Sequence, residues 1–122
     1  MILTPGKIIH VFCVFAKPPK YKYAVCICPK SRFFFLINSK PRNTLPDAQV
    51  LIRKSDFTFL RDDSYINAGT ICAISEDEIN QGKEVDFLTI PLKSEIIKVT
   101  ENCKYHSPVN KELIARNLSE ND

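Results

Sequence analysis

The chain has 122 residues, of which 44% are hydrophobic, 25% charged and 10% aromatic. This balance excludes a disordered chain, a collagen-like repeat and a coiled coil, and the length suits a single domain over residues 1–122. No apolar run approaches the roughly 18 residues that a membrane helix needs. The first residues lack the basic region and the cleavage site of a signal peptide, so we expect a cytoplasmic protein with no membrane partner.

The net charge of +3 is the difference between two unlike halves of the sequence. Residues 1–61 carry seven Lys and four Arg against two carboxylates, a net charge of +9, whereas residues 62–122 have a net charge of −6. A surface with a charge of +9 attracts polyanions such as nucleic acids. A solvated face rich in lysine has the same composition, so the charge alone leaves both interpretations open.

The first two-thirds of the chain predict β-strands. Five runs are rich in β-branched and aromatic residues and are bounded by turn-forming residues. These runs cover residues 7–16, 21–28, 33–38, 48–53 and 64–72. Strands so short and so closely spaced are typical of a small barrel or sandwich.

The residues after the fifth run change to helical patterns. Ser75 followed three residues later by Glu78 is a capping-box pattern, which predicts a short helical turn that ends at Gly82. Pro91 suits the first position of a helix that runs to about Cys103. This helix is expected to turn Leu92, Ile96, Ile97, Val99 and Cys103 towards the core.

Ser107-Pro108 predicts the start of a last helix, and the tail 119–122 is expected to fray. The inward-facing residues of this helix are expected to be Val109, Leu113, Ile114 and Leu118. The predicted fold is therefore mainly β with peripheral α, a small barrel with strands over about 7–72 and helices over about 75–118.

Metal and covalent catalysis find little support in the sequence. His10, Cys13, Cys26 and Cys28 come nearest to a zinc set, but His10 and Cys13 differ by an odd number and face opposite sides of a strand. The five cysteines are interpreted as small apolar residues in a reducing compartment. His106, at a helix junction, is expected to be structural, not the partner of a Cys nucleophile. We predict neither a metal nor a cofactor.

The order of several short segments is informative. Pro5-Gly6 precedes the first strand, a basic loop over 17–22 leads to the second, and the third ends in Asn38-Ser39-Lys40. Asp63-Ser64-Tyr65-Ile66 then begins a stretch that reaches a short acidic helix at Ile79. Over roughly residues 5–100 this layout resembles the MazF/PemK family of toxin endoribonucleases. The resemblance implies a small SH3-like barrel with C-terminal helices.

The resemblance also implies metal-independent cleavage of single-stranded RNA, in which the 2′-hydroxyl attacks the neighbouring phosphate. In the family, an Arg-Pro pair opening the second strand supplies a cation, and a Thr or Ser ending the third strand helps to hold the phosphate. Here Tyr23-Ala24 stands at the Arg-Pro position, with Lys22 before it, and Ser39 matches the hydroxyl. The implied catalytic residues are thus Lys22, Tyr23 and Ser39, and the implied partners are an acidic antitoxin and a second copy in a homodimer.

Basic, polar and aromatic residues of three loops are the predicted nucleic-acid-binding residues. They are Lys17, Lys20, Tyr21, Lys30, Arg32, Asn38, Lys40 and Arg42. If the loops converge on one barrel face, the cations hold phosphates while Tyr21 and Tyr23 stack on bases. Alternatively, these two rings share a strand face and pack in the core. Phe34 points opposite to its neighbours, so a C-terminal helix or a second subunit is expected to cover it.

The missing Arg-Pro pair leaves three functions open. Lysine neutralises a phosphate but lacks the bidentate fork of arginine. The chain is a PemK-like toxin or a relative that binds and cleaves RNA, or a non-catalytic nucleic-acid- or protein-binding barrel that has lost the nuclease site. In the third case it is a subunit of a larger complex, docks through its acidic half and binds no nucleic acid.

Overall fold

The computed structural model describes residues 1–119 and is built mainly from β-strands. The strands are β1 (Lys7–Cys13), β2 (Lys20–Cys28), β3 (Phe33–Asn38), β4 (Gln49–Ile52), β5 (Ser64–Asn67), β6 (Cys72–Ala73) and β7 (Lys83–Phe87). The helices are the 3₁₀-helix η1 (Pro46–Ala48) and the α-helices α1 (Glu76–Gln81), α2 (Ile90–Asn102) and α3 (Pro108–Ser119). The prediction of a mainly-β fold with peripheral helices is confirmed.

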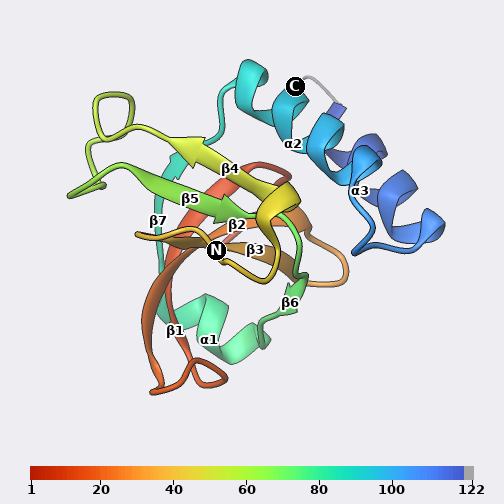
Figure 1. Ribbon diagram of the computed structural model, residues 1–122. Helices are drawn as coiled ribbons and strands as arrows, with labels where there is room; N and C mark the ends of the chain where they lie inside the picture. Colours follow the sequence, from red (N-terminus) through yellow and green to blue (C-terminus); the bar gives the residue numbers. More distant parts are fainter. Residues whose placement is uncertain (120–122) are drawn as a thin grey trace.

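All seven strands belong to one antiparallel sheet (Figure 1). Its order is β4-β5-β3-β2-β1-β7, and the short β6 pairs with β3 beside this path. Since β4 and β7 stand at opposite ends of that order, hydrogen bonds do not close the sheet into the barrel that the sequence predicted. The central strands β1, β2 and β3 carry the basic loops at their ends.

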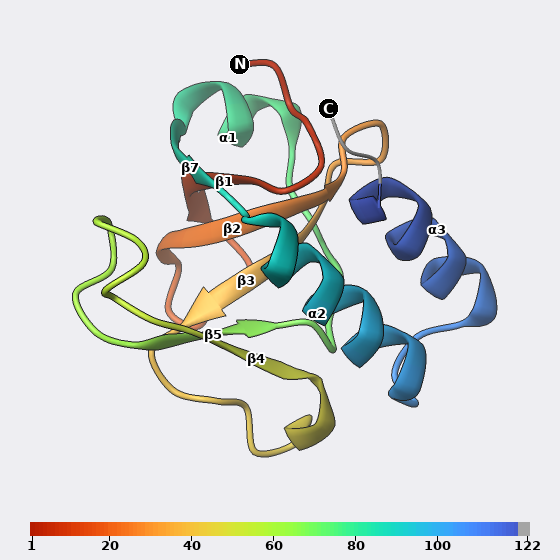
Figure 2. The same ribbon diagram turned by 90° about the horizontal axis from the view of Figure 1, so that it is seen from above.

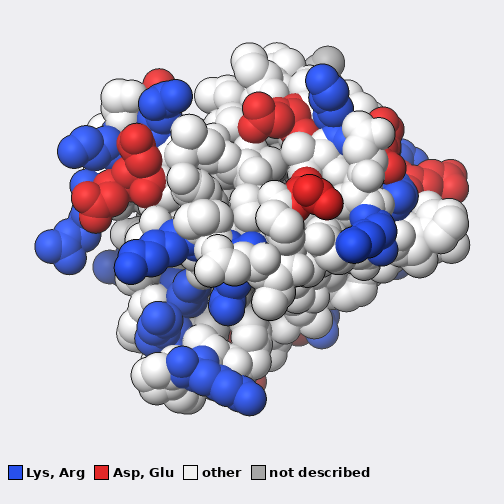
Figure 3. Space-filling model, viewed as in Figure 1, with Lys and Arg blue, Asp and Glu red and all other residues white. Residues whose placement is uncertain are grey.

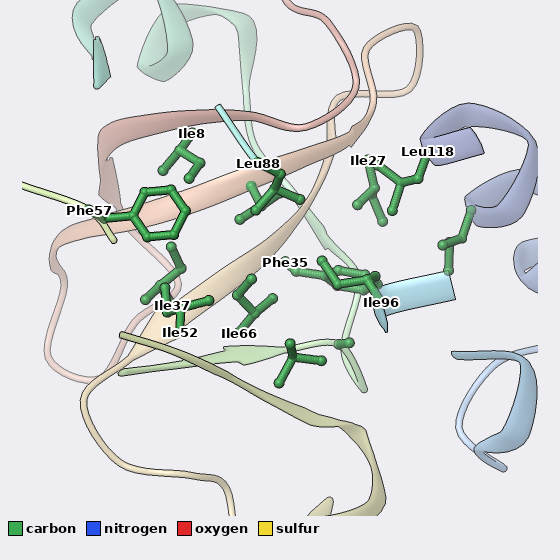
Figure 4. Close-up of a cluster of buried hydrophobic side chains, with 14 residues drawn as sticks. Ile8, Ile27, Phe35, Ile37, Ile52, Phe57, Ile66, Leu88, Ile96 and Leu118 are labelled. Atoms are coloured by element: carbon green, nitrogen blue, oxygen red, sulfur yellow. The ribbon is translucent and has the colours of Figure 1, made fainter. Parts of the chain in front are cut away.

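One face of the sheet packs against α2 and α3. Ile8, Val25 and Phe35 project from β1, β2 and β3 into a cluster that includes Ile96 of α2 and Ile114 of α3. Figure 2 shows α2 lying across this face with α3 beside it, and Figure 4 shows part of the cluster. Burying so many large apolar side chains supplies most of the favourable free energy of folding.

The opposite face carries a second, smaller cluster. Val11, Cys26 and Phe34 pack there against Ile74 and against Ile79 of α1. Phe34 does face away from its neighbours and is fully buried, as the alternation predicted. Its cover comes from the segment around α1, however, and neither a C-terminal helix nor a second subunit is needed to bury this ring.

The helices begin where their capping residues predict. The Ser75 hydroxyl accepts a hydrogen bond from the Glu78 amide at 3.2 Å, and the Thr89 hydroxyl accepts one from the Leu92 amide at 3.3 Å. Val109, expected to face inward, is instead 74% exposed. It stands in the first turn of α3, which extends beyond the sheet. The expectation of a frayed tail is wrong for Ser119, which ends α3, and for 120–122 it lies outside the described residues.

Two strand predictions need correction. Residues 83–87 form β7, an edge strand that the sequence analysis missed because its charged residues gave no hydrophobic run. It pairs with β1 and contributes Glu84, whose carboxylate lies 2.8 Å from the Lys7 amino group. The predicted strand 64–72 is two strands, β5 and β6, with an intervening turn in which the Gly69 amide donates to Asn67 at 3.2 Å.

Helix α1 ends directly against β1. A Cβ atom at Gly82 would lie 2.8 Å from the carbonyl oxygen of His10, so glycine is required at this close approach. Of the helices in residues 1–119, none has both the length and the apolar character that crossing a bilayer demands.

Candidate nucleic-acid interface

A groove of about 580 Å³, which we call the cationic groove, lies where the β1–β2 hairpin meets the loop that follows β3. Five cations line it: Lys17, Lys20, Lys22, Lys40 and Arg42. No Asp or Glu is among the described residues that line it. Figure 3 shows Lys and Arg side chains gathered at the lower left, over this end of the sheet.

The cations of the groove are not neutralised within the described residues. The one ion pair in residues 1–119 joins Lys7 to Glu84, away from the groove. Like charges held together repel one another, and this repulsion is relieved when an anion binds. The groove is therefore chemically suited to a ligand that carries several negative charges.

Lys22 is the least exposed cation of the groove. Its amino group donates a hydrogen bond to the side-chain oxygen of Asn38, on the neighbouring strand β3. Burial lowers the pKa of Lys22, and the nearby charges of Lys20 and Arg42 lower it further. An anion in the groove would favour the protonated amine, so ligand binding and Lys22 protonation are coupled.

Asn38 has an unused donor. Its amide nitrogen is buried and has no hydrogen-bond partner within residues 1–119. A buried donor without a partner costs free energy, and a phosphate or carbonyl oxygen in the groove would supply the missing acceptor.

The one thiol that lines the groove, that of Cys72, and the nearby thiol of Cys13 add no nucleophile. Burial raises the pKa of Cys72, which lines the groove, and raises that of Cys13 to about 11. Both thiols are therefore protonated at neutral pH, and the thiolate is the reactive form. The groove thus offers cations, amides and the Ser39 hydroxyl, but no activated cysteine.

The three residues implied as catalytic do not meet at one site. Lys22 and Ser39 line the cationic groove, whereas Tyr23 projects from the opposite face of the sheet. Its ring lies there between His10, at a centroid distance of 4.7 Å, and Phe59, at 4.6 Å. The separation follows from strand geometry, since adjacent residues of β2 face opposite sides. Ser39, just after β3, borders cavities on both faces.

Lys30 and Arg32 are not part of the groove. They lie in the β2–β3 turn, separated from Lys20 by the length of β2, roughly 26 Å at about 3.3 Å per residue. There they line a different cavity, of about 400 Å³, together with Glu76. Arg32 also donates from Nε to the carbonyl oxygen of Ile74 at 3.2 Å. The three basic loops therefore do not all converge on one face, since this loop lies apart from the other two.

Tyr21 also lies on the face opposite the groove. It is 61% exposed, and its ring contacts Phe12 and His10, each at a centroid distance of 5.2 Å. The two tyrosines do share a strand face, as predicted, but only Tyr23 packs against the core. Tyr21 is therefore an exposed ring close to the cationic end of β2, without being a wall of the groove.

A second cavity, of about 350 Å³, lies beside Tyr23 between β3 and the β4–β5 loop. Phe59, Arg61 and Asp62 of that loop help to line it, and the sequence analysis assigned none of them to a site. The available signal was three large apolar residues, Phe57, Phe59 and Leu60, in a loop that is otherwise polar. Asn67 and Thr70, which border the cationic groove, gave no comparable signal.

The histidines have structural surroundings. His10 stacks on Tyr23 while Cys13 is buried on the other face, and within residues 1–119 no three His, Cys, Asp or Glu residues gather closely enough to hold a metal ion. Nε2 of His106 lies 2.6 Å from the carbonyl oxygen of Ala68, and its ring packs 5.9 Å from that of Phe35. His106 thereby ties the α2–α3 loop to the sheet.

Comparison with protein-family models and with curated proteins gives no match for this chain. Its function therefore has to be inferred from the chemistry of its surfaces. The cations of the cationic groove come from two separate segments that flank the same cavity, an arrangement suited to a ligand with more than one negative charge.

Proposed function

We propose that the protein binds single-stranded RNA in the cationic groove, as a PemK-like toxin or a relative of one. The observation that carries this proposal is the set of five cations that line one cavity without a carboxylate. Polyanion binding is driven largely by cations that replace the counterions of phosphates. A groove between two loops suits one flexible strand, and exposed rings nearby favour unpaired bases. The proposal includes the fold, which we infer to be an opened form of the small SH3-like barrel.

A salt titration tests RNA binding. Each phosphate contact contributes about −0.7 to the slope of log affinity against log salt for a single strand, so five contacts give a slope of about −3.5. Replacing Lys20 and Lys22 by glutamate should weaken binding and flatten the slope by at least about 1.4. Unchanged affinity and slope in that variant would show that RNA does not occupy the groove.

RNA cleavage is a second candidate function, favoured by the surroundings of Lys22. A lysine whose pKa is lowered exchanges a proton more readily near neutral pH than a surface lysine does. In the reaction the 2′-oxygen bonds to phosphorus, the bond to the 5′-oxygen breaks, and one proton moves from the former oxygen to the latter. In this proposal Lys22 and the free amide of Asn38 stabilise charge on the phosphate, and Ser39 holds it; their common position at the groove supports these roles.

Growth arrest on induced expression separates the two candidates. A toxin should arrest growth, and an equally abundant Lys22→Ala/Ser39→Ala variant should not. The purified protein should also cleave single-stranded RNA in the presence of a chelator. Soluble wild-type protein that binds RNA but neither arrests growth nor cleaves would support the non-catalytic binding module.

The partners form part of the same proposal. The cationic groove would attract an acidic antitoxin segment by the same charges that attract RNA, and toxins of this kind would pair as homodimers in the cytoplasm. The five free thiols fit such a reducing compartment. Size-exclusion mass with and without RNA checks these points. A mass that RNA leaves unchanged would favour the third function, a subunit of a larger complex.

A further inference from the structure

A row of aromatic rings crosses the sheet on the face opposite the cationic groove. The β1–β2 register places His10 opposite Tyr23 and Phe12 opposite Tyr21. Neighbouring rings lie 4.7 to 5.2 Å apart, and Phe59 extends the row beyond Tyr23 at 4.6 Å with an interplanar angle of 47°. Tyr21, next to the other end of the row at Phe12, is exposed. The row therefore presents ring surface to solvent instead of ending inside the core.

The row ends at the cavity of about 350 Å³ beside β3. Tyr23 and Phe59 supply ring walls, while Ser39, Arg61 and Asp62 supply polar groups around them. A small cavity with apolar walls and a few polar groups suits a flat, partly polar ligand. We refer to this cavity as the aromatic pocket.

The aromatic pocket and the cationic groove meet at the end of β3. Asn38 and Ser39 border both cavities, although Lys22 and Tyr23 lie on opposite faces of the sheet. A nucleotide joins a charged backbone to a flat ring that can turn away from it. One strand that bends over the end of β3 can therefore place phosphates in the groove and a base in the pocket.

We propose that the aromatic pocket binds one unpaired base of the RNA whose backbone lies in the cationic groove. The base stacks on the Phe59 or Tyr23 ring, the Asp62 carboxylate accepts hydrogen bonds from its amino or imino groups, and Arg61 donates to its acceptors. This inference rests on the proposed RNA binding and adds contact with a base to a site that otherwise holds only phosphate.

The test compares an RNA with its abasic counterpart. The probes are a labelled single-stranded RNA of about ten nucleotides and the same backbone with abasic riboses, both measured by fluorescence anisotropy at low salt. Phe59→Leu keeps an apolar side chain but removes the ring, and should weaken binding of the normal RNA roughly fivefold or more. It should leave binding of the abasic RNA unchanged. Phe87→Leu, which removes an exposed ring on β7, is the matched control and should change neither.

Asp62→Asn is a second variant, at an exposed position where folding is not at risk. If Asp62 acted only through its charge, removing the carboxylate would strengthen binding of both RNAs. If Asp62 contacts a base, Asp62→Asn should affect the two RNAs differently. The normal RNA should bind more weakly, and the abasic RNA should bind equally well or more tightly.

Each outcome decides the proposal. Normal and abasic RNA that bind equally to the wild type, with a strong salt dependence, would overturn the base pocket while leaving RNA binding in the groove intact. A loss of both RNAs in Phe59→Leu would assign that ring to folding instead of recognition and would also overturn it. If the wild type bound neither RNA at low salt, the proposed function and the pocket would fall together.

Discussion

The two ends of β2 both carry cations, but they differ in what surrounds those cations. At one end, Lys20 and Lys22 line a groove that contains no carboxylate. At the other, Lys30 and Arg32 share a cavity with Glu76, and Arg32 is bound to a backbone carbonyl. A cation that shares its cavity with a carboxylate gains less from an external phosphate than a cation without one. Affinity for a polyanion therefore depends on missing counter-charges as much as on the number of cations.

The largest effect should come from reversing two charges of the cationic groove, compared with the same reversal in the β2–β3 turn. Lys40→Glu/Arg42→Glu changes the second wall of the cationic groove and should weaken RNA binding about 100-fold at low salt. Lys30→Glu/Arg32→Glu makes the same change in net charge at the other end and should alter affinity less than about threefold. Anisotropy titrations of both variants check this. Equal losses would mean that RNA responds to overall charge and not to the groove.

RNA bound in the cationic groove should also stabilise the folded protein, and the cations of the β2–β3 turn should not contribute to this stabilisation. At a free RNA concentration ten times Kd, the free energy of unfolding should rise by about 1.4 kcal/mol. The accompanying rise in Tm, measured by differential scanning fluorimetry, should persist in Lys30→Glu/Arg32→Glu and vanish in Lys40→Glu/Arg42→Glu. A rise that both variants keep would place the RNA elsewhere on the molecule.

A smaller effect should follow from adding a carboxylate to the cationic groove and removing one from the cavity of Lys30. Thr70 is exposed at the border of the cationic groove, and Thr70→Asp places a carboxylate there, which should weaken RNA binding about fivefold. Glu76→Gln removes a carboxylate from the cavity of Lys30 and should strengthen binding by less than about twofold. If Thr70→Asp has no effect, the absence of carboxylates is not what distinguishes the groove.

The smallest effect concerns the pH dependence of stability. The pKa of Lys22 in the folded protein lies below its ordinary 10.5, so the unfolded chain binds more protons between the two values. Lys22 should therefore make the free energy of unfolding rise with pH in that window. Urea unfolding of the wild type minus Lys22→Met, as a function of pH, measures this slope.

Lys30→Met is the matched control, because it also removes one positive charge, but at an exposed position. The same difference between wild type and variant is measured for it as a function of pH. Burial raises the pKa of Cys13 to about 11, so its thiol acts in the opposite sense above its ordinary 9.0 and lowers stability as pH rises. Both proteins keep Cys13, but the Lys22 charge lowers the pKa of that thiol, so its contribution cancels only in part. A difference that falls with pH would contradict the assigned direction for Lys22.

The fold was predictable where local signals are strong. The hydrophobic runs located β1 to β4 to within three residues and the start of β5, and Ser75 located α1 through its capping pattern. β7 was not predictable, because an edge strand with alternating charges has little apolar surface to bury. Closure of the sheet was not predictable either, since it depends on whether the two edge strands meet.

The candidate site was predictable in part. Alternation along β2 already separated Lys22 from Tyr23, but the family resemblance placed both at one reaction centre. The grouping of Lys20 and Lys22 with Lys40 and Arg42 was anticipated from their loops, and the structure brings them to one cavity. Phe59 joins Tyr23 only through a long-range contact between the β4–β5 loop and the sheet. No local pattern encodes such a contact.

The row of rings has a spectroscopic consequence. The sequence contains four tyrosines and no tryptophan, so tyrosine dominates its intrinsic ultraviolet emission. Two of the four, Tyr21 and Tyr23, belong to the row, and Tyr23 forms a wall of the aromatic pocket. A base that stacks there would change this emission directly. The native, unlabelled protein therefore carries its own reporter beside the proposed base site.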